Sequence, residues 1–303
     1  MTVEAHGLTK VYSGKKAVND LSFTLEPGTV TGFLGPNGSG KSTTMRLMLG
    51  LDHGEGQTTW EGKALTAHPH VTKVVGAHLD ARFFNPNRSA RNHLRMMASE
   101  ANISDQRVDE VISLVGLESV AKKRPKTFSL GMGQRLGLAG AILAQPKVLM
   151  LDEPANGLDP QSIQWLRDFL KFYASQGNVV FVSSHLLSEM QLMAEHLVVI
   201  SRGSLIADEN MAAFVGRSTR NDVLVRALDR DRLLAVLLAA DVAAVAEGDD
   251  GVAVAGVDSA QVGRIAFVNQ VQLIELSPRT ASLEEAFLEL TSGGQEYQTG
   301  GHS

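Results

Sequence analysis

The chain has 303 residues, 44% of them hydrophobic, and a formal net charge of −5, so it is long enough for a large α/β domain and a smaller second one. The acidic balance argues against a general nucleic-acid-binding surface, because such surfaces neutralise phosphates with clustered Lys and Arg. The absence of cysteine excludes disulfides and cysteine-ligated zinc.

No stretch of the sequence predicts secretion or membrane insertion. The N-terminus MTVEAHGLTK has neither the charged nor the apolar region of a signal peptide. The longest apolar runs, 196–201 and 233–240, are far shorter than the roughly 20 residues needed to cross a bilayer. We therefore expect a cytoplasmic protein that reaches a membrane only through a partner.

The first two thirds of the chain alternate strand-like and helical runs, a pattern that predicts βαβ units and a mostly parallel sheet. The predicted strands span residues 21–25, 29–34, 147–152, 178–184 and 196–201. Between Arg88 and Ala121, apolar residues recur at three- and four-residue spacings in two predicted helices, 89–100 and 105–117. These helices indicate a separate helical layer.

A second unit is expected to begin near Gly216, where the composition shifts to Ala, Val and Asp. Its predicted elements are strand 222–227, helix 229–240, strand 241–248, a Gly-Asp-Asp-Gly turn, strand 252–256, helix 259–270, strand 271–276 and helix 282–290. This order predicts a small α+β, ferredoxin-like domain over 216–292. The last helix opens on Ser282 with Glu285 three residues later, a capping box, and the tail 293–303 is expected to be disordered.

A phosphate-binding loop is predicted at GPNGSGKST, which matches G-x-x-x-x-G-K-[ST] between a predicted strand and a predicted helix at 43–50. Its glycines let backbone N–H groups curl round phosphate oxygens, Lys41 reaches the β- and γ-phosphates, and the Ser42 hydroxyl is placed to ligate Mg²⁺. The flanking elements argue against a chance glycine-rich turn. The predicted nucleotide-binding residues are Gly35, Pro36, Asn37, Gly38, Ser39, Gly40, Lys41, Ser42 and Thr43.

Two adjacent carboxylates, Asp152 and Glu153, end the predicted strand 147–152, at the edge of the sheet where α/β proteins bind ligands. Neighbouring strand residues point to opposite sides. We therefore expect Asp152 to face Mg²⁺ and Glu153 to face the water that attacks the γ-phosphate, as general base or by orienting it. The alternative is a pair of solvated carboxylates in a turn.

With these motifs in place, residues 1–210 resemble an ATP-binding-cassette (ABC) ATPase. NGLDP resembles the D-loop of that family with Asp159, and VSSH resembles its switch histidine, His185, which the resemblance implies contacts the γ-phosphate. Tyr12 resembles the aromatic residue that stacks on adenine, with an isolated surface tyrosine as the alternative. Glu153, His185 and Lys41 are thus the expected catalytic residues.

The resemblance also implies the fold of the larger domain. We expect a P-loop NTPase of the ABC ATPase type over 1–215, with a mostly parallel core sheet and an antiparallel β subdomain. A helical subdomain is expected at about 85–130.

The family signature L-S-G-G-Q-x-Q-R resembles FSLGMGQR, residues 128–135. Ser129, Gly131, Gln134 and Arg135 match that pattern, whereas Leu130 and Met132 depart from it. The hydroxyl, the bare backbone amide and the N-terminus of the following helix are the groups that would clamp phosphate. Ser129, Gly131 and Gln134 are therefore expected to contact ATP held by another subunit, and the S-L-G-M type resembles drug-exporting members.

A second departure lies in VVGAHLDARFF, where the family generally has a glutamine that touches Mg²⁺ and senses the transport subunit. Asp80 is placed at this position, with His78 as a competing register. A carboxylate can still take a metal-bound water. The expected metal-contacting residues are therefore Ser42, Asp152 and Asp80.

The resemblance implies a motor that uses ATP and Mg²⁺ as a head-to-tail dimer, with an identical second ATPase subunit and an integral-membrane permease as partners. We expect it on the inner face of the cell membrane, exporting a hydrophobic drug or antibiotic-like compound, as bacitracin- and daunorubicin-type resistance ATPases do. The alternatives are lipid or polysaccharide export and a soluble ABC ATPase of DNA repair or translation. A P-loop kinase or GTPase would lack the signature and the switch histidine.

Overall fold

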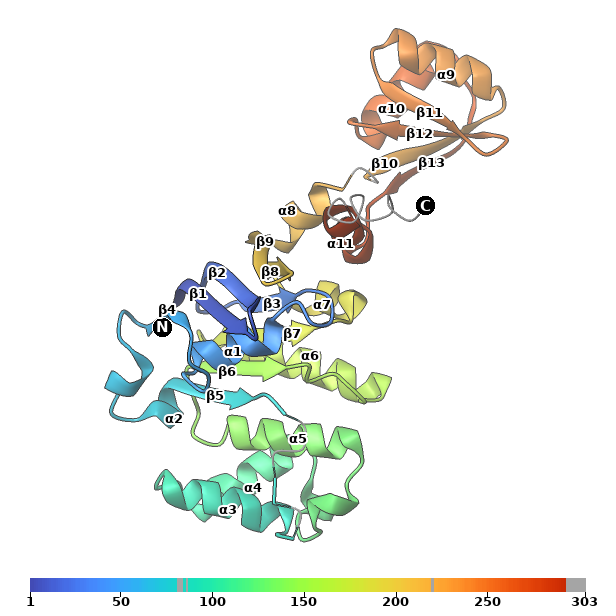
Figure 1. Ribbon diagram of the computed structural model, residues 1–303. Helices are drawn as coiled ribbons and strands as arrows, with labels where there is room; N and C mark the ends of the chain where they lie inside the picture. The colour runs from blue at the N-terminus through green and yellow to red at the C-terminus, as the bar shows by residue number, and fades with distance from the viewer. Residues whose placement is uncertain (81–83, 86, 219–220, 293–303) are drawn as a thin grey trace, which may run out of the picture. The chain divides into compact units, whose positions relative to one another are not determined.

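The computed structural model describes residues 1–80, 84–85, 87–218 and 221–292. It divides into two compact units, Met1–Met211 and Ala212–Ser303, whose elements are labelled in Figure 1. Among the described residues, no helix combines the length and apolar character needed to cross a bilayer. The predicted disordered tail, 293–303, lies outside the described residues.

A six-stranded sheet with the strand order β5-β6-β7-β3-β8-β9 forms the centre of the first unit. The strands are β3 (Val30–Leu34), β5 (Val75–His78), β6 (Val148–Asp152), β7 (Val179–Ser184), β8 (His196–Ser201) and β9 (Ser204–Asn210). Every neighbouring pair is parallel except β8 and β9. The mostly parallel sheet expected from the sequence is thus confirmed, and α6 (Pro160–Ser175) and α7 (Leu187–Met193) pack on it.

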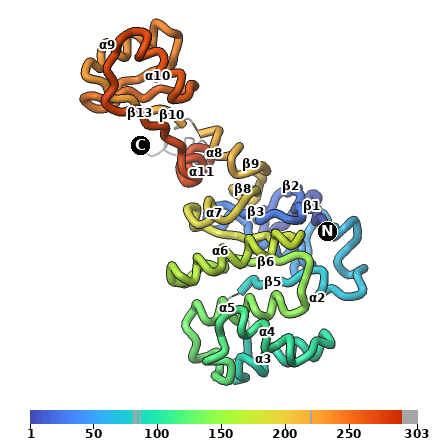
Figure 2. Tube along the Cα trace, turned by 180° about the vertical axis from the view of Figure 1, so that it is seen from behind, coloured from blue at the N-terminus to red at the C-terminus, as the bar shows by residue number. Residues whose placement is uncertain are grey.

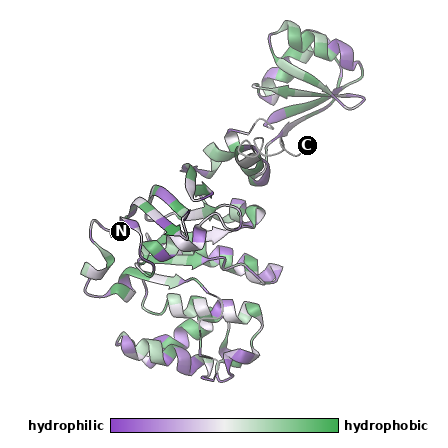
Figure 3. Ribbon diagram, viewed as in Figure 1, coloured by the Kyte–Doolittle hydropathy of each residue, from purple (hydrophilic) through white to green (hydrophobic). Residues whose placement is uncertain are grey.

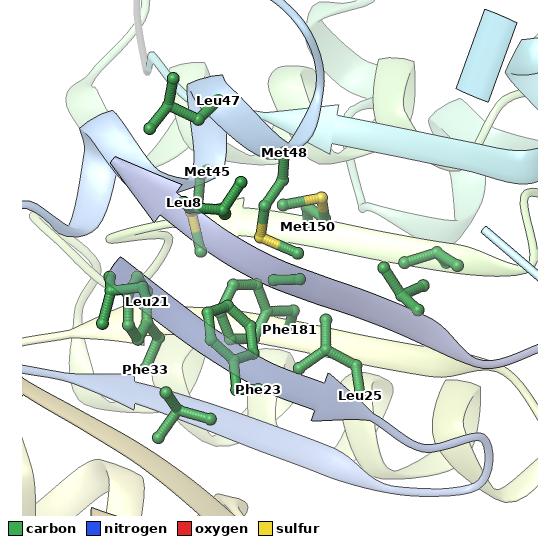
Figure 4. Close-up of a cluster of buried hydrophobic side chains, with 14 of the residues drawn as sticks. Leu8, Leu21, Phe23, Leu25, Phe33, Met45, Leu47, Met48, Met150 and Phe181 are labelled. Carbon is green, nitrogen blue, oxygen red and sulfur yellow. The ribbon is translucent and has the colours of Figure 1, made fainter. Parts of the chain in front are cut away.

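A three-stranded antiparallel sheet, β2-β1-β4, faces this core together with α1 (Lys41–Met48). Its strands are β1 (Val3–Tyr12), β2 (Lys15–Leu25) and β4 (Glu55–Trp60). The ring of Phe23 on β2 lies 5.9 Å from that of Phe33 on β3 and 5.6 Å from that of Phe181 on β7, measured between centroids, and Figure 4 shows the three side chains together. The predicted strand 21–25 is the end of the longer β2, whose pairing with β1 shifts register and so interrupts the alternation at its start.

The two helices of the predicted helical layer are α3 (Ala90–Glu100) and α4 (Asp105–Leu114), and α5 (Leu130–Ala141), which follows the signature, packs against both. In Figures 1 and 2, α5 lies between β5 and the other two helices, which agrees with their contacts. Hydrophilic and hydrophobic bands alternate along α3 and α4 in Figure 3, as expected for helices with one buried face. The described chain also has α2 (Val71–Val74) and three short 3₁₀ turns, Leu65–Ala67, Glu118–Val120 and Pro125–Thr127.

The second unit contains a four-stranded antiparallel sheet with the order β11-β12-β10-β13. Its elements are β10 (Asp222–Ala227), α9 (Arg230–Ala239), β11 (Ala243–Glu247), β12 (Gly251–Ala255), α10 (Ser259–Val268), β13 (Leu273–Arg279) and α11 (Leu283–Ser292), preceded by α8 (Met211–Gly216). This is the predicted order of strands and helices, while the ferredoxin-like class stays a prediction. The capping box is confirmed, because Glu285 N donates to Ser282 Oγ (3.2 Å) and Ser282 N donates to Glu285 Oε2 (2.9 Å).

Candidate functional site

The phosphate-binding loop connects β3 to α1 and needs its glycines for two different reasons. Gly38 and Gly40 have φ angles of +79° and +108°, in the left-handed region that glycine adopts without steric cost. Gly35 leaves no room for a side chain, since a Cβ there would lie 2.4 Å from Ser39 Oγ and 2.5 Å from the Ile200 carbonyl oxygen. The loop can therefore fold tightly against the end of β8.

The start of α1 presents backbone donors at this loop. Gly40 is the N-cap residue and supplies no side-chain cap, so the first N–H groups of the helix are available to an anion. Ser39 Oγ belongs to a residue that is 4% exposed, and it has no hydrogen-bond partner among the described residues. A buried hydroxyl of this kind fits a ligand oxygen as its partner.

Lys41 lies beneath the loop with only 7% of its surface exposed. Its Nζ donates to the Gly35 carbonyl oxygen at 2.7 Å and lies 3.8 Å from Glu153 Oε1. Burial lowers the pKa of the Lys41 ammonium, and the charges of Glu153 and Asp152 partly oppose this. Added negative charge at the loop would therefore strongly favour the ammonium form.

The two predicted carboxylates are held by a serine on the neighbouring strand that sequence reasoning missed. Asp152 pairs with Ser183 in the β6–β7 register. The Ser183 hydroxyl donates to Asp152 Oδ1 and accepts from Glu153 N, the latter at 2.9 Å. The signal in the sequence was a polar pair, Ser183 and Ser184, at the end of an otherwise apolar strand.

Glu153 does not continue the strand, which corrects the expected geometry. β6 ends at Asp152, and Glu153 has a left-handed backbone with φ of +51°. The direction of its side chain is therefore set by a turn, not by the strand alternation from which it was predicted. Such a conformation is strained for a residue other than glycine and persists where neighbours hold it, often at functional sites.

The carboxylate of Glu153 lies between two of the predicted catalytic groups. Its Oε2 is 2.7 Å from His185 Nδ1 and accepts from the His185 backbone N at 3.3 Å, while Oε1 faces Lys41 Nζ. Because a carboxylate only accepts, Nδ1 is assigned the proton in this contact. Lys41, Asp152, Glu153 and His185 are thus brought together at the carboxyl ends of β3, β6 and β7.

The signature begins at the N-terminus of α5. Ser129 is the N-cap, and its Oγ accepts from Met132 N at 3.2 Å. The Leu130 side chain packs on Gly157 so closely that a Cβ there would lie 2.2 Å from Leu130 Cδ2. Leu130, one of the two departures from the family pattern, therefore joins the signature to the NGLDP loop within the protomer.

Gln134 is placed inside the protomer. It is 6% exposed, its Oε1 lies 2.7 Å from His78 Nε2, and its Nε2 donates to the Glu153 carbonyl oxygen at 3.4 Å. The expected contact of Gln134 with ATP on another subunit stays a prediction, and its side chain would have to leave these partners to make it.

Asp159 is the N-cap of α6, where its carboxylate accepts from Ser162 N at 2.8 Å and from Ser162 Oγ at 3.1 Å. These hydrogen bonds lower the pKa of Asp159. Its predicted D-loop role would add to this capping role.

The two residues that compete for the glutamine position differ in their surroundings. His78 ends β5 and is buried at 5% exposure, whereas Asp80 follows the strand and is exposed. Exposure makes Asp80 the more accessible of the two to a metal-bound water.

Tyr12, the predicted adenine-stacking residue, is 47% exposed at the end of β1. Its hydroxyl donates to Asp52 Oδ2 at 3.2 Å, and Arg46 Nε donates to the same oxygen at 2.9 Å. Lys10 Nζ lies 4.9 Å from the ring centroid. This network fixes the ring while leaving much of it accessible to a base.

The residues present fit a nucleotide with a divalent cation. The loop supplies backbone donors and Lys41 for phosphates, and Ser42 and Asp152 supply the oxygen ligands that Mg²⁺ prefers. Among the described residues no group of three or more His, Asp or Glu could hold a metal by itself. A cation here would therefore need phosphate oxygens and water to complete its shell.

Comparisons with known proteins give two family matches and several similar proteins. A family model described as ABC transporter matches residues 18–156, and another described as a domain of unknown function matches 221–284. The chain is 36% identical over 302 residues to the uncharacterized ABC transporter ATP-binding protein YhcH of Bacillus subtilis (strain 168), covering 97% of each. It is 33% identical over 302 residues to the bacitracin transport ATP-binding protein BcrA of Bacillus licheniformis, covering 96% of this chain and 98% of that protein.

A solved structure of the ATP binding subunit of an ABC transporter shares the fold. It superposes with a TM-score of 0.65 at 24% identity, covering 72% of this chain and 93% of that chain.

Proposed function

The chain belongs to the ABC transporter family as an ATP-binding protein, and from that premise we propose that it is the ATP-hydrolysing motor of an exporter. The observation that carries the proposal is the position of Glu153, whose carboxylate lies 2.7 Å from His185 Nδ1 and 3.8 Å from Lys41 Nζ. This arrangement combines a proton acceptor, a polar group that can orient water and a phosphate-binding cation in one place.

Each of these groups has one task in the proposed reaction. The backbone N–H groups of the loop and Lys41 bind the phosphates and stabilise the charge that develops on transfer. Glu153 accepts a proton from the attacking water or orients it, and His185 holds the carboxylate and that water in place. Mg²⁺, held by Ser42 and Asp152 with a contribution from Asp80, would neutralise phosphate charge.

A complete site requires a second copy of the chain. The groups around Glu153 lie at the carboxyl ends of the strands, whereas Ser129 and Gly131 lie at the start of α5 in the helical layer. In the proposed dimer, ATP bound by the loop of one copy meets the Ser129 hydroxyl, the Gly131 amide and the helix N-terminus of the other. Binding of ATP would thereby close the dimer, and hydrolysis would release it.

The membrane-spanning part is proposed to be a separate permease, with the motor acting at the cytoplasmic face of the membrane. The substrate class follows from resemblance. The bacitracin transport protein covers nearly the whole chain at 33% identity, and the S-L-G-M signature is of the drug-exporter type. We propose a hydrophobic antibiotic-like compound as the cargo.

The test is an export assay in a sensitive host that carries the chain together with a candidate permease. The wild type should lower accumulation of a peptide antibiotic such as bacitracin and raise the tolerated concentration. Glu153→Gln, expressed at the same level, should give no protection. If hosts that carry the wild type, Glu153→Gln or an empty vector are equally sensitive to the antibiotic, the proposed cargo is rejected.

A further inference from the structure

A buried histidine connects the helical layer to the turn that carries Glu153. His78, the last residue of β5, is 5% exposed and lies with Nε2 2.7 Å from Gln134 Oε1 on α5. Its ring also lies against Gly137, where a Cβ would fall 2.0 Å from His78 Cε1. α5 can approach β5 this closely only because residue 137 is a glycine.

The direction of each hydrogen bond follows from chemistry. Gln134 Nε2 donates to the Glu153 carbonyl oxygen, so the other end of the amide, Oε1, faces His78 as an acceptor. His78 must then carry its proton on Nε2. Burial lowers the pKa of His78, and Gln134, Asp80 and Asp152 partly oppose this shift.

The hydrogen bonds that run from His78 through Gln134 end at the strained backbone of Glu153. Glu153 has a φ of +51°, and its carbonyl oxygen accepts from Gln134 Nε2 at 3.4 Å and from Asn156 N at 3.2 Å. A residue in this conformation keeps it only while its neighbours hold it. The Gln134 amide is one of those neighbours, and His78 fixes which way that amide points.

We propose that His78 is a positioning residue for ATP hydrolysis, which holds the Gln134 amide against the Glu153 turn and so links α5 to the carboxylate that acts on the attacking water. The inference rests on the proposed role of Glu153. It also gives two residues in the first half of α5 a common task. Ser129 at the start of the helix would meet the nucleotide of the other copy, and Gln134, just over one turn later, transmits the position of the helix to Glu153.

The test separates the hydrogen bond from the volume of the ring. His78→Phe keeps a ring and removes the Nε2 donor, and it should lower kcat about tenfold, since small displacements of a catalytic group have effects of this size. KM for ATP should stay within about twofold, because the hydrogen bond of His78 goes to Gln134 and not to the phosphate-binding loop or Lys41. His78→Gln, whose amide nitrogen reaches the place of Nε2, should recover kcat to within about threefold of wild type.

A second buried histidine provides the matched control. His93 on α3 is 8% exposed, and among the described residues no hydrogen bond joins it to Glu153 or Gln134. His93→Phe should therefore damage packing without changing kcat by more than about twofold. If His78→Phe does not fold, Gln134→Met is measured instead and should lower kcat to the same extent. In a double variant, His78→Phe and Gln134→Met should not lower kcat further than either alone.

The outcomes also separate this inference from the proposed function. A wild-type chain that hydrolyses no ATP contradicts the function. Hydrolysis by the wild type with unchanged kcat in His78→Phe, or an equal loss in His78→Gln and His78→Phe, overturns the positioning role alone.

Discussion

His185 and Glu153 face each other across the ends of two neighbouring strands, with Nδ1 of the imidazole 2.7 Å from Oε2 of the carboxylate. The contact crosses from the end of β7 to the turn after β6. It holds the two side chains against each other within one protomer. Preorganisation of this kind lowers the barrier to reaction because no group has to be reoriented in the transition state.

Replacing His185 should therefore impair turnover more than binding. We expect His185→Ala to lower the rate of phosphate release about 100-fold, as for loss of a group that positions a base and its water, with ATP affinity changed less. The matched control is His196→Ala, because His196 also pairs with a carboxylate, Asp208, at 2.6 Å on β8. A rate for His196→Ala that falls as far as that for His185→Ala would mean that the loss is structural.

The start of α5 should act between subunits. Ser129→Arg places a long cation at the proposed contact, and we expect it to abolish the ATP-dependent dimer in light scattering and to lower hydrolysis at least about tenfold. Ser104→Arg is the control, since Ser104 caps α4 in the same way, with Oγ accepting from Arg107 N at 3.3 Å. Normal dimerisation of Ser129→Arg would remove Ser129 from the interface.

Because Tyr173 is partly buried, we expect the folded chain to lose stability at alkaline pH. Burial raises the pKa of its phenol to about 12 from the ordinary 10.0, so in this range the folded chain keeps a proton that the unfolded chain loses. The resulting stability is complete below pH 10 and is lost as the pH rises to about 12. Urea unfolding at pH 9 and pH 11 should show a smaller fall for Tyr173→Phe than for wild type, and equal falls would contradict the assignment.

The second unit has its own ion-pair network. Arg279 contacts Asp222 at 2.6 Å and Glu247 at 2.7 Å across the sheet. We expect Arg279→Gln to reduce the hydrogen-exchange protection of β10 about tenfold, in line with loss of charge-assisted hydrogen bonds. Arg226→Gln is the control, because its carboxylate contacts are long, 3.5 and 3.6 Å, and it should change protection less than about twofold. Equal losses of protection in Arg279→Gln and Arg226→Gln would show that the lost positive charge, and not the short hydrogen bonds of Arg279, protects β10.

Features that depend on short contiguous stretches could be predicted from the sequence. The loop from Gly35 to Thr43 folds as expected because its glycines dictate the local backbone. The capping box of Ser282 and Glu285 is equally local. The order of strands and helices in the second unit, and the strands β3, β6, β7 and β8 of the first, follow from hydrophobic periodicity.

Features that depend on distant parts of the chain could not be predicted in the same way. Ser183 holds Asp152 and Glu153 only because β7 lies next to β6, which no local pattern specifies. The left-handed turn at Glu153 replaces the strand alternation, and the burial of Gln134 against His78 depends on α5 packing on β5. Alignment to a motif identifies such residues but does not give their partners.

In the proposed reaction, this chain hydrolyses ATP with Glu153 as the group that acts on water. The direct test is phosphate release by the purified chain with ATP and Mg²⁺, measured beside Glu153→Gln and with ATP binding followed in parallel. We predict that Glu153→Gln binds ATP as wild type does, forms a stable ATP-bound dimer and turns over at least about 100-fold more slowly. Phosphate release by Glu153→Gln at the wild-type rate would contradict the account.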